Sequence, residues 1–297
     1  MYPAPFRYHR PETLEAAVGL LAHFGDDARI MAGGQSVIPM MKLRMGEASE
    51  LVDIGRLPNL SYVKIEGERL LIGALATHAM IAASEDARRV PLVAETAGGI
   101  ADRQVRSMGT IGGGLSVADP SGCWPTSLSA LDAVIQVAGP AGSRSIAMAD
   151  FVQDTYLTAL NTGELVTSIE IPIPESGTGS AYVAFKRSAS AYPTVSCGVQ
   201  LSMQGDSCSA ARLVLGGAGP TPILSVEADS ALVGEQVTAE TLLKAAELIV
   251  AAAEPPPDAR GSVEFKRAML KNLVVEAGQR ALARSQGEQI FGGHRYA

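Results

Sequence analysis

The N-terminal part of the chain combines a helical pattern of apolar residues with two strand-like runs. One set of apolar residues recurs every three or four positions, as on one face of a helix: Leu14, Ala17, Val18, Leu21 and Phe24. Gly25 stands where this helix would end, and short apolar runs at 28–31 and 50–54 are typical of buried strands. We therefore predict a small α/β unit, which Pro58 and Asn59 would separate from the following region.

From Ser61 onward the pattern becomes that of hairpins. Polar and apolar residues alternate over 62–66, Gly67 breaks the run, and an apolar run returns at 70–74. Thr77 is a suitable N-cap for a short helix, because its hydroxyl can accept from a backbone N–H. The other elements expected in this region are helices at 77–83 and 91–97 and strands at 131–137 and 165–171.

A second boundary is expected over 172–179, where prolines and glycines gather. Beyond it the pattern predicts a three-stranded antiparallel sheet and two helices, over 181–186, 194–203, 209–215, 239–253 and 262–284. The fold class is thus α+β. The expected domains are an N-terminal α/β subdomain at 1–57, a second α+β subdomain at 58–176, a C-terminal domain at 177–285 and a tail without a readable pattern at 286–297.

Composition excludes several classes of protein. A net charge of −7 argues against nucleic-acid binding, which requires a basic surface. No apolar run approaches the roughly 18 residues of a membrane span, and the N-terminus has no secretory signal, so a cytoplasmic location is expected. Cys123, Cys197 and Cys208 are too few to hold an iron–sulfur cluster, and the four scattered histidines show no metal-ligand spacing. No metal site is therefore expected on this chain.

Two glycine clusters are the main candidates for ligand binding. Gly33-Gly34 and Gly112-Gly113-Gly114 would let backbone N–H groups converge on an anion, because glycine lacks Cβ and adopts positive φ. Ser36 and Thr110 add a hydroxyl beside each cluster. Together they suggest a diphosphate held from two sides, although two tight turns explain the spacing equally well. Neither cluster is a G-x-G-x-x-G or Walker loop.

Several longer motifs resemble those of one protein family. Residues 32–44 are similar to the first FAD loop of the medium subunits of carbon monoxide dehydrogenase and related molybdenum hydroxylases, including xanthine dehydrogenase. Residues 104–113 resemble their second loop, and Ala-Asp-Pro follows at 118–120. Residues 215–222 and 260–262 resemble their C-terminal domain, so the similarity covers nearly the whole chain. It implies an FAD-binding fold of the vanillyl-alcohol-oxidase (PCMH) type.

The resemblance also implies which residues contact FAD. Segments 32–36 and 110–114 would surround the diphosphate, and Asp119 would fix the ADP half. His78, Lys186 and Tyr192 would lie near the flavin ring. Ile100 and Val166 would supply apolar walls. The full set of implied cofactor-binding residues is Ala32, Gly33, Gly34, Gln35, Ser36, Thr77, His78, Ile100, Thr110, Ile111, Gly112, Gly113, Gly114, Asp119, Val166, Lys186 and Tyr192.

Each single contact has a plainer alternative. His78 could be a solvated surface residue, and Lys186 could mark an exposed strand end. Ile100 and Val166 could be ordinary core residues. The chain also departs from the family pattern at three positions. Gly114 replaces a usual asparagine, and Cys123 and Ala191 replace usual acidic residues, which puts individual contacts in doubt.

The function implied by the resemblance is electron transfer. Substrate would be oxidised at a molybdenum cofactor in a large molybdopterin subunit, and two [2Fe-2S] clusters of a small subunit would deliver electrons to FAD on this chain. The acceptor would be NAD, a quinone, a cytochrome or oxygen, and the expected assembly is a hetero-hexamer. No catalytic residue is assigned here. A self-contained FAD oxidase of the vanillyl-alcohol-oxidase fold and an assembly subunit without flavin remain alternatives.

Overall fold

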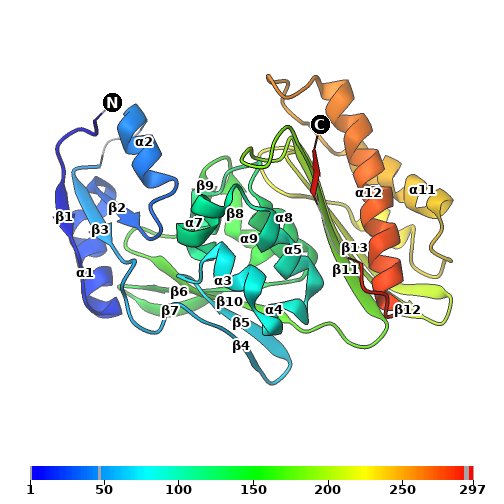
Figure 1. Ribbon diagram of the computed structural model, residues 1–297, viewed down its shortest axis with the longest axis horizontal. Coiled ribbons are helices and arrows are strands. Elements are labelled where there is room, and N and C mark those ends of the chain that lie inside the picture. The colour runs from blue at the N-terminus through cyan, green and yellow to red at the C-terminus, as the bar shows by residue number, and fades with distance from the viewer. Residues whose placement is uncertain (1, 46–47, 291–293, 297) are drawn as a thin grey trace.

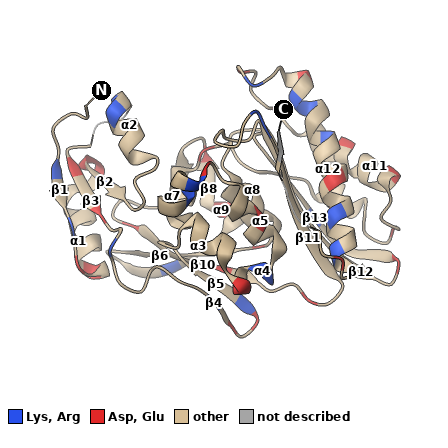
Figure 2. Cartoon of the chain, viewed as in Figure 1, with Lys and Arg blue, Asp and Glu red and all other residues tan. Residues whose placement is uncertain are grey.

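The computed structural model describes residues 2–45, 48–290 and 294–296 (Figure 1). The chain runs from an N-terminal lobe with α2 at its top, through a central unit, to a lobe covered by α12 (Figure 1). Lysine, arginine, aspartate and glutamate are scattered over all three parts (Figure 2). Among the described residues, none of the helices combines the length and the apolar character that a membrane span requires.

The N-terminal lobe is a small parallel sheet in the order β1-β3-β2. Its elements are β1 (Arg7–His9), α1 (Leu14–Phe24), a 3-10 turn η1 (Gly25–Asp27), β2 (Ala28–Met31), α2 (Val37–Leu43) and β3 (Glu50–Asp53). Helix α1 begins at the expected place because the Thr13 hydroxyl accepts a hydrogen bond from the backbone N–H of Ala16. Its buried Ala17 and Leu21 pack in one apolar cluster with Leu165 of the central unit. The sequence pattern thus predicted α1, β2 and β3, but not β1 or α2.

The central unit is an antiparallel sheet in the order β4-β5-β10-β6-β7. The strands are β4 (Val63–Glu66), β5 (Arg69–Gly73), β6 (Val134–Gly139), β7 (Gly142–Ala147), β10 (Leu165–Pro172) and a separate pair, β8 (Val152–Asp154) and β9 (Leu157–Thr158). The helices are α3 (His78–Ala83), α4 (Glu85–Arg88), α5 (Pro91–Gly99), α6 (Arg103–Met108), α7 (Ile111–Val117), α8 (Cys123–Ala130) and α9 (Met148–Phe151).

Helices α4, α6, α7, α8 and α9 were not among the expected elements, and α7 and α8 show why. The glycine cluster 112–114 lies within the first half of α7, although glycine disfavours helices. Thr110 caps α7 by accepting from the Gly113 N–H. Every residue of α8 is buried, so α8 has no polar face from which a period could be read. Tertiary packing rather than local propensity accounts for both helices.

The C-terminal lobe is built on three long antiparallel strands, as expected. They are β11 (Thr178–Lys186), β12 (Val195–Gln204) and β13 (Ser207–Gly216). Two short strands extend the sheet at its edges in the described part of the chain, β14 (Ile223–Leu224) beside β13 and β15 (His294–Tyr296) beside β11. Such short edge strands leave no alternating pattern, and β15 falls in the tail for which no element was expected.

Both faces of this sheet are covered. Ala181 and Val183 of β11 pack with helices α11 (Ala239–Ala251) and α12 (Val263–Ser285), and a short helix α10 (Val226–Ser230) precedes them. Tyr182 and Ala184 point the opposite way, into the core of the central unit. Successive side chains of a strand point to opposite faces, so β11 joins two cores at once.

We predict that Gly179 is needed for the packing of α12 on β11. A Cβ at Gly179 would lie 2.0 Å from the Ala281 carbonyl oxygen, so Gly179→Ala should lower the free energy of unfolding, by about 1–3 kcal/mol for such overpacking. Gly19→Ala is the matched control, because Gly19 is an exposed helical residue with no neighbouring atom within 4 Å. It should be neutral or add about 0.5–1 kcal/mol. Urea unfolding of both variants tests this, and equal stabilities would contradict it.

Candidate functional site

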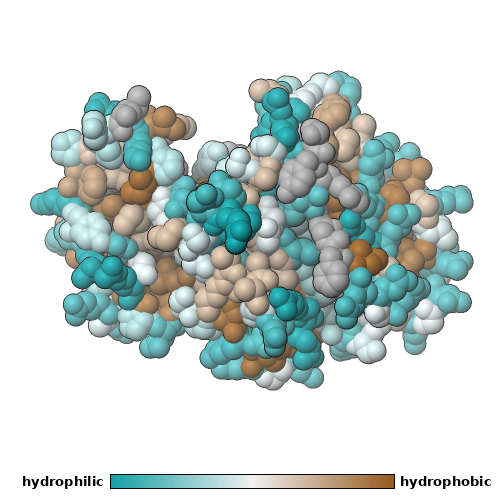
Figure 3. All heavy atoms as spheres, in the orientation of Figure 1, coloured by the Kyte–Doolittle hydropathy of each residue, from teal (hydrophilic) through white to brown (hydrophobic). Residues whose placement is uncertain are grey.

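A cavity of about 270 Å³ lies where the three parts of the chain meet. Its walls come from residues 30–37, from the central helices and from residues 186–193. A second cavity of about 510 Å³ adjoins it on the side of the N-terminal lobe. The residues that line both are Ile30, Ala32, Ser36, Val37, Gly113 and Val117. Figure 3 shows the molecule hollowed between the lobe with α2 and the lobe with α12. The two cavities form one elongated site.

The first glycine loop crosses the middle of this site. It connects β2 to α2, and Gly34 has a φ of 72°, which favours glycine. A Cβ at Gly33 would lie 1.8 Å from the carbonyl oxygen of Met108, so only glycine permits the two backbone segments to cross here. Within the described ranges, no protein acceptor receives the backbone N–H groups of residues 33–36. These N–H groups are therefore available to an acceptor outside the chain.

The second glycine loop plays a different part. The backbone N–H groups of Ile111 and Gly112 donate to the carbonyls of Ala76 and Ala74, at 3.1 and 2.9 Å. The Gly113 N–H donates to the Thr110 hydroxyl at 3.2 Å. A Cβ at Gly112 would meet Ala74 at 2.7 Å. The glycines of α7 thus allow close packing of the helix, while its first N–H groups already have partners in the protein.

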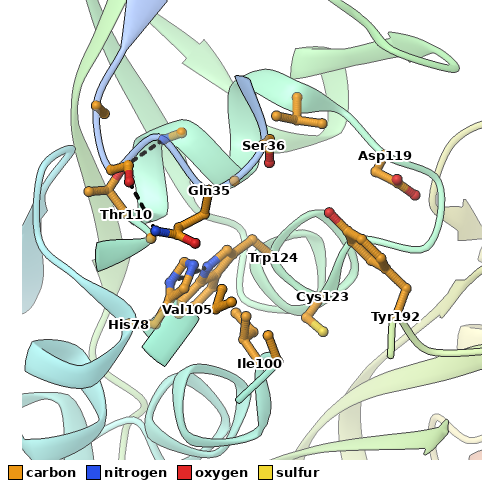
Figure 4. Close-up of a pocket in the computed structure, with 18 of the residues that line it drawn as sticks. Gln35, Ser36, His78, Ile100, Val105, Thr110, Asp119, Cys123, Trp124 and Tyr192 are labelled. Carbon is orange, nitrogen blue, oxygen red and sulfur yellow. Dashed lines mark hydrogen bonds between the residues drawn. The ribbon is translucent and has the colours of Figure 1, made fainter. Parts of the chain in front are cut away.

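A histidine and a tryptophan form the back of the first cavity (Figure 4). His78 is buried beside the only tryptophan of the chain, and Trp124 Nε1 donates to His78 Nδ1 at 3.3 Å. Because an indole N–H can only donate, Nδ1 must be the acceptor and the imidazole proton lies on Nε2. Burial lowers the pKa of His78 to about 4, with a smaller contribution from the charge of Arg106. His78 is therefore neutral at pH 7 and is not the solvated residue of the alternative interpretation.

Lys186 brings a buried positive charge to the same cavity. It is the last residue of β11, its side chain is buried, and Nζ donates to the carbonyl oxygens of Gly99 at 2.6 Å and Ala189 at 3.5 Å. Both partners are neutral, and burial lowers the pKa of the ammonium. This burial overturns the alternative that Lys186 is an exposed strand end.

Asp119 and Tyr192 close the opposite wall (Figure 4). The Asp119 carboxylate accepts from the Ser121 backbone N–H at 2.8 Å and from the Tyr156 hydroxyl at 3.2 Å. The Tyr192 ring is half exposed, while its hydroxyl end points inward toward Ser36 (Figure 4). Burial of that end, together with the charge of Asp119, raises the pKa of Tyr192 to about 12. Tyr192 thus presents a neutral aromatic surface to the cavity.

Most of the residues singled out in the sequence come together in this elongated site. Those that line the first cavity are Ala32, Gly33, Gly34, Gln35, Ser36, His78, Ile100, Thr110, Gly113, Gly114, Asp119, Lys186 and Tyr192. Gly112 and Val166 line the second cavity. Thr77 and Ile111 line neither: Thr77 caps α3, and Ile111 points into the core. Cys123, noted as a departure from the family pattern, lies on the wall of the first cavity.

Other lining residues were not singled out. Val105, Trp124, Ser190 and Pro193 line the first cavity, and Tyr156 lines the second. Trp124 could have been considered because the sequence has no other tryptophan. The others stand in segments without a motif of their own, so nothing local distinguished them from core or loop residues.

Comparison with known proteins gives a consistent result over nearly the whole chain. Residues 4–174 match the family described as "FAD binding domain in molybdopterin dehydrogenase", and residues 180–281 match "CO dehydrogenase flavoprotein C-terminal domain". The carbon monoxide dehydrogenase medium chain of Afipia carboxidovorans is 39% identical, over 96% of this chain and 100% of that protein. The glyceraldehyde dehydrogenase medium chain of Sulfolobus acidocaldarius is 36% identical, over 93% and 98%.

Solved structures agree with these sequence matches. A chain of the cyanide-inactivated Cu,Mo-CO dehydrogenase superposes with a TM-score of 0.93 at 38% identity, covering 96% of this chain and 100% of that one. A chain of quinoline 2-oxidoreductase from Pseudomonas putida 86 gives 0.90 at 32% identity, with 97% and 99% covered. The expected fold class is thereby confirmed.

We predict that His78 makes stability depend on pH. Its pKa is about 4 in the folded protein, against 6.5 for an unperturbed histidine, so the unfolded chain binds the proton more readily and stability falls as pH drops through this range. Between pH 7 and pH 5 the loss from this residue should be about 2 kcal/mol. His78→Gln should remove that part of the pH dependence. Denaturant unfolding at both pH values measures it, and an unchanged slope in the variant would contradict the assignment.

Proposed function

Because the chain belongs to the family of FAD-binding medium subunits of molybdenum-dependent hydroxylases, we propose that it is the electron-transfer subunit of such a complex. FAD, when bound, would accept electrons singly and release them singly or in pairs, as the acceptor requires. The supporting observation is the elongated site: the backbone N–H groups of residues 33–36 have no protein acceptor in the described part of the chain, and their loop lines the first cavity and reaches the second at Ser36.

The residues present fit FAD in three respects. The four N–H groups of 33–36 suit an anionic diphosphate, because backbone donors bind phosphate oxygens well. The second cavity, with the apolar Met41, Leu75 and Val166, suits one flat end of a dinucleotide. The first cavity, with the ring of Tyr192 and the ammonium of Lys186, suits the redox-active end.

For Asp119 we propose another role than the resemblance implied. Asp119 was expected at the ADP half, but it shares the first cavity with Lys186 and Tyr192, which were expected at the flavin ring. We therefore place Asp119 at the flavin end. There the buried cation of Lys186 would favour the more electron-rich reduced cofactor, since a nearby positive charge stabilises added negative charge.

The chain depends on partners for its electrons. Cys123, Cys197 and Cys208 are all buried in this chain and form no C-x-x-C pair. A [2Fe-2S] cluster normally requires four ligands, which this set of thiols cannot provide. We propose that a small subunit with two [2Fe-2S] clusters supplies electrons from a large molybdopterin subunit, and that NAD, a quinone, a cytochrome or oxygen receives them.

The decisive experiment is to purify the chain with whatever copurifies and to record its absorbance spectrum and flavin content. Stoichiometric FAD together with iron–sulfur bands and two further subunits is the expected result. FAD on a lone chain that oxidises substrates would instead support a self-contained oxidase. A complex without flavin, even after FAD is supplied, would overturn the proposal and would indicate an assembly subunit.

We predict that Gly33→Ala reduces the FAD content of the purified complex. The new Cβ would collide with the Met108 carbonyl oxygen, 1.8 Å from its ideal position, and would displace the loop that holds the diphosphate. FAD affinity should fall at least about tenfold, as expected for loss of one to two kcal/mol of backbone contacts. Gly98→Ala is the control, because its nearest neighbour is 3.9 Å away and it is exposed. Equal FAD content in both variants would argue against the diphosphate position.

A further inference from the structure

Arg260 joins three segments that are far apart in the sequence. It lies in the loop between α11 and α12, and its Nε donates to the Asp258 carboxylate at 2.9 Å. Its Nη1 donates to the Ser121 hydroxyl at 3.0 Å and to the Pro193 carbonyl at 3.0 Å. The guanidinium therefore links the C-terminal helical region to two other loops.

Both of those loops belong to the wall of the first cavity. Ser121 donates its backbone N–H to Asp119, and Pro193 directly follows Tyr192. Arg260 itself does not line the cavity, yet it holds the neighbours of the two residues that close its wall. Any movement of the guanidinium would therefore be passed to Asp119 and Tyr192.

The far end of Arg260 is firmly anchored. Asp258 also accepts from the buried Lys266 of α12, with Nζ 2.9 Å from Oδ1, and Lys266 donates further to the Pro256 carbonyl at 2.5 Å. Burial alone would raise the pKa of Asp258, but hydrogen bonds from Lys266 and Arg260 outweigh it and hold the pKa well below its usual range. The carboxylate stays charged and fixes the guanidinium in one position.

We propose that Arg260 is a positioning residue, which sets the Asp119 and Tyr192 loops around the flavin end and so makes cofactor retention depend on the C-terminal domain. This inference rests on the proposed function. Arginine suits the role because its planar fork donates in several directions at once, whereas lysine has a single ammonium.

The test compares Arg260→Met and Arg260→Lys with Arg267→Met in the copurified complex. Arg267 is a suitable control because it lies close by in sequence, on α12, and also donates to a backbone carbonyl, that of Ala253 at 2.8 Å, but touches neither cavity loop. The FAD dissociation rate and the visible spectrum of the bound flavin are measured beside the melting temperature.

Arg260→Met should release FAD about tenfold faster and shift the flavin spectrum, as loss of two hydrogen bonds implies. The FAD dissociation rate of Arg260→Lys should lie between those of Arg260→Met and the wild type. Arg267→Met should release FAD at the wild-type rate. Ser121→Ala removes only the hydrogen bond that the Ser121 hydroxyl accepts from Arg260. It should change the FAD dissociation rate and the flavin spectrum in the same direction as Arg260→Met, but by less. This variant tests the inference if Arg260→Met does not fold.

Two results would overturn the inference: wild-type FAD release in Arg260→Met and Ser121→Ala, or an equal defect in Arg267→Met, which would show a general effect on stability. Failure of the proposed function looks different, because the wild-type complex itself would then hold no FAD.

Discussion

The site depends on the contact of two backbones at Gly33. The loop after β2 passes so close to the end of α6 that any side chain at Gly33 would occupy the position of the Met108 carbonyl. This contact brings the N-terminal lobe against the central unit and leaves the N–H groups of the loop without protein acceptors among the described residues. Unpaired backbone donors are costly when buried. Residues 33–36 are half-buried or exposed, so water can hydrogen-bond these N–H groups until an anion replaces it. Under the proposed function, the geometry that joins the lobes therefore also offers donors to a diphosphate.

Burial then decides the charges in the site. His78 lies against Trp124 and stays neutral, whereas Lys186 keeps its ammonium beside two backbone carbonyls. The two groups differ because the usual pKa of an imidazole is close to neutral pH, so burial readily makes it neutral. The usual pKa of a lysine ammonium lies far above neutral pH, so it keeps its proton. The first cavity therefore combines the aromatic side chains of Trp124 and Tyr192 with the buried ammonium of Lys186. Such a site favours a flat ligand that gains electron density.

Sequence periodicity predicted the elements whose polar and apolar faces differ, and missed those held by tertiary contacts. Helix α1 and strand β2 occur where the pattern placed them. Helix α8 was missed because it is buried on all sides, and α7 because Gly112 and its neighbours belong to it. In the site, the resemblance located the loops but not the direction of each side chain: Ile111 lies in a loop motif and yet points into the core. Such directions follow from packing, which one sequence does not display.

The C-terminal lobe must be held at a fixed orientation if Lys186 and Tyr192 are to reach a cavity built mainly by the rest of the chain. A buried ion pair supplies part of that constraint: Arg284 of α12 donates to Glu95 of α5 at 2.9 Å, and also to the Ser180 carbonyl of β11 at 2.7 Å. A buried pair adds little net stability, but removal of one partner costs about 3–5 kcal/mol because the other charge is stranded. The pair therefore helps to hold the arrangement in which Lys186 of one lobe and the glycine loop of another line the same cavity.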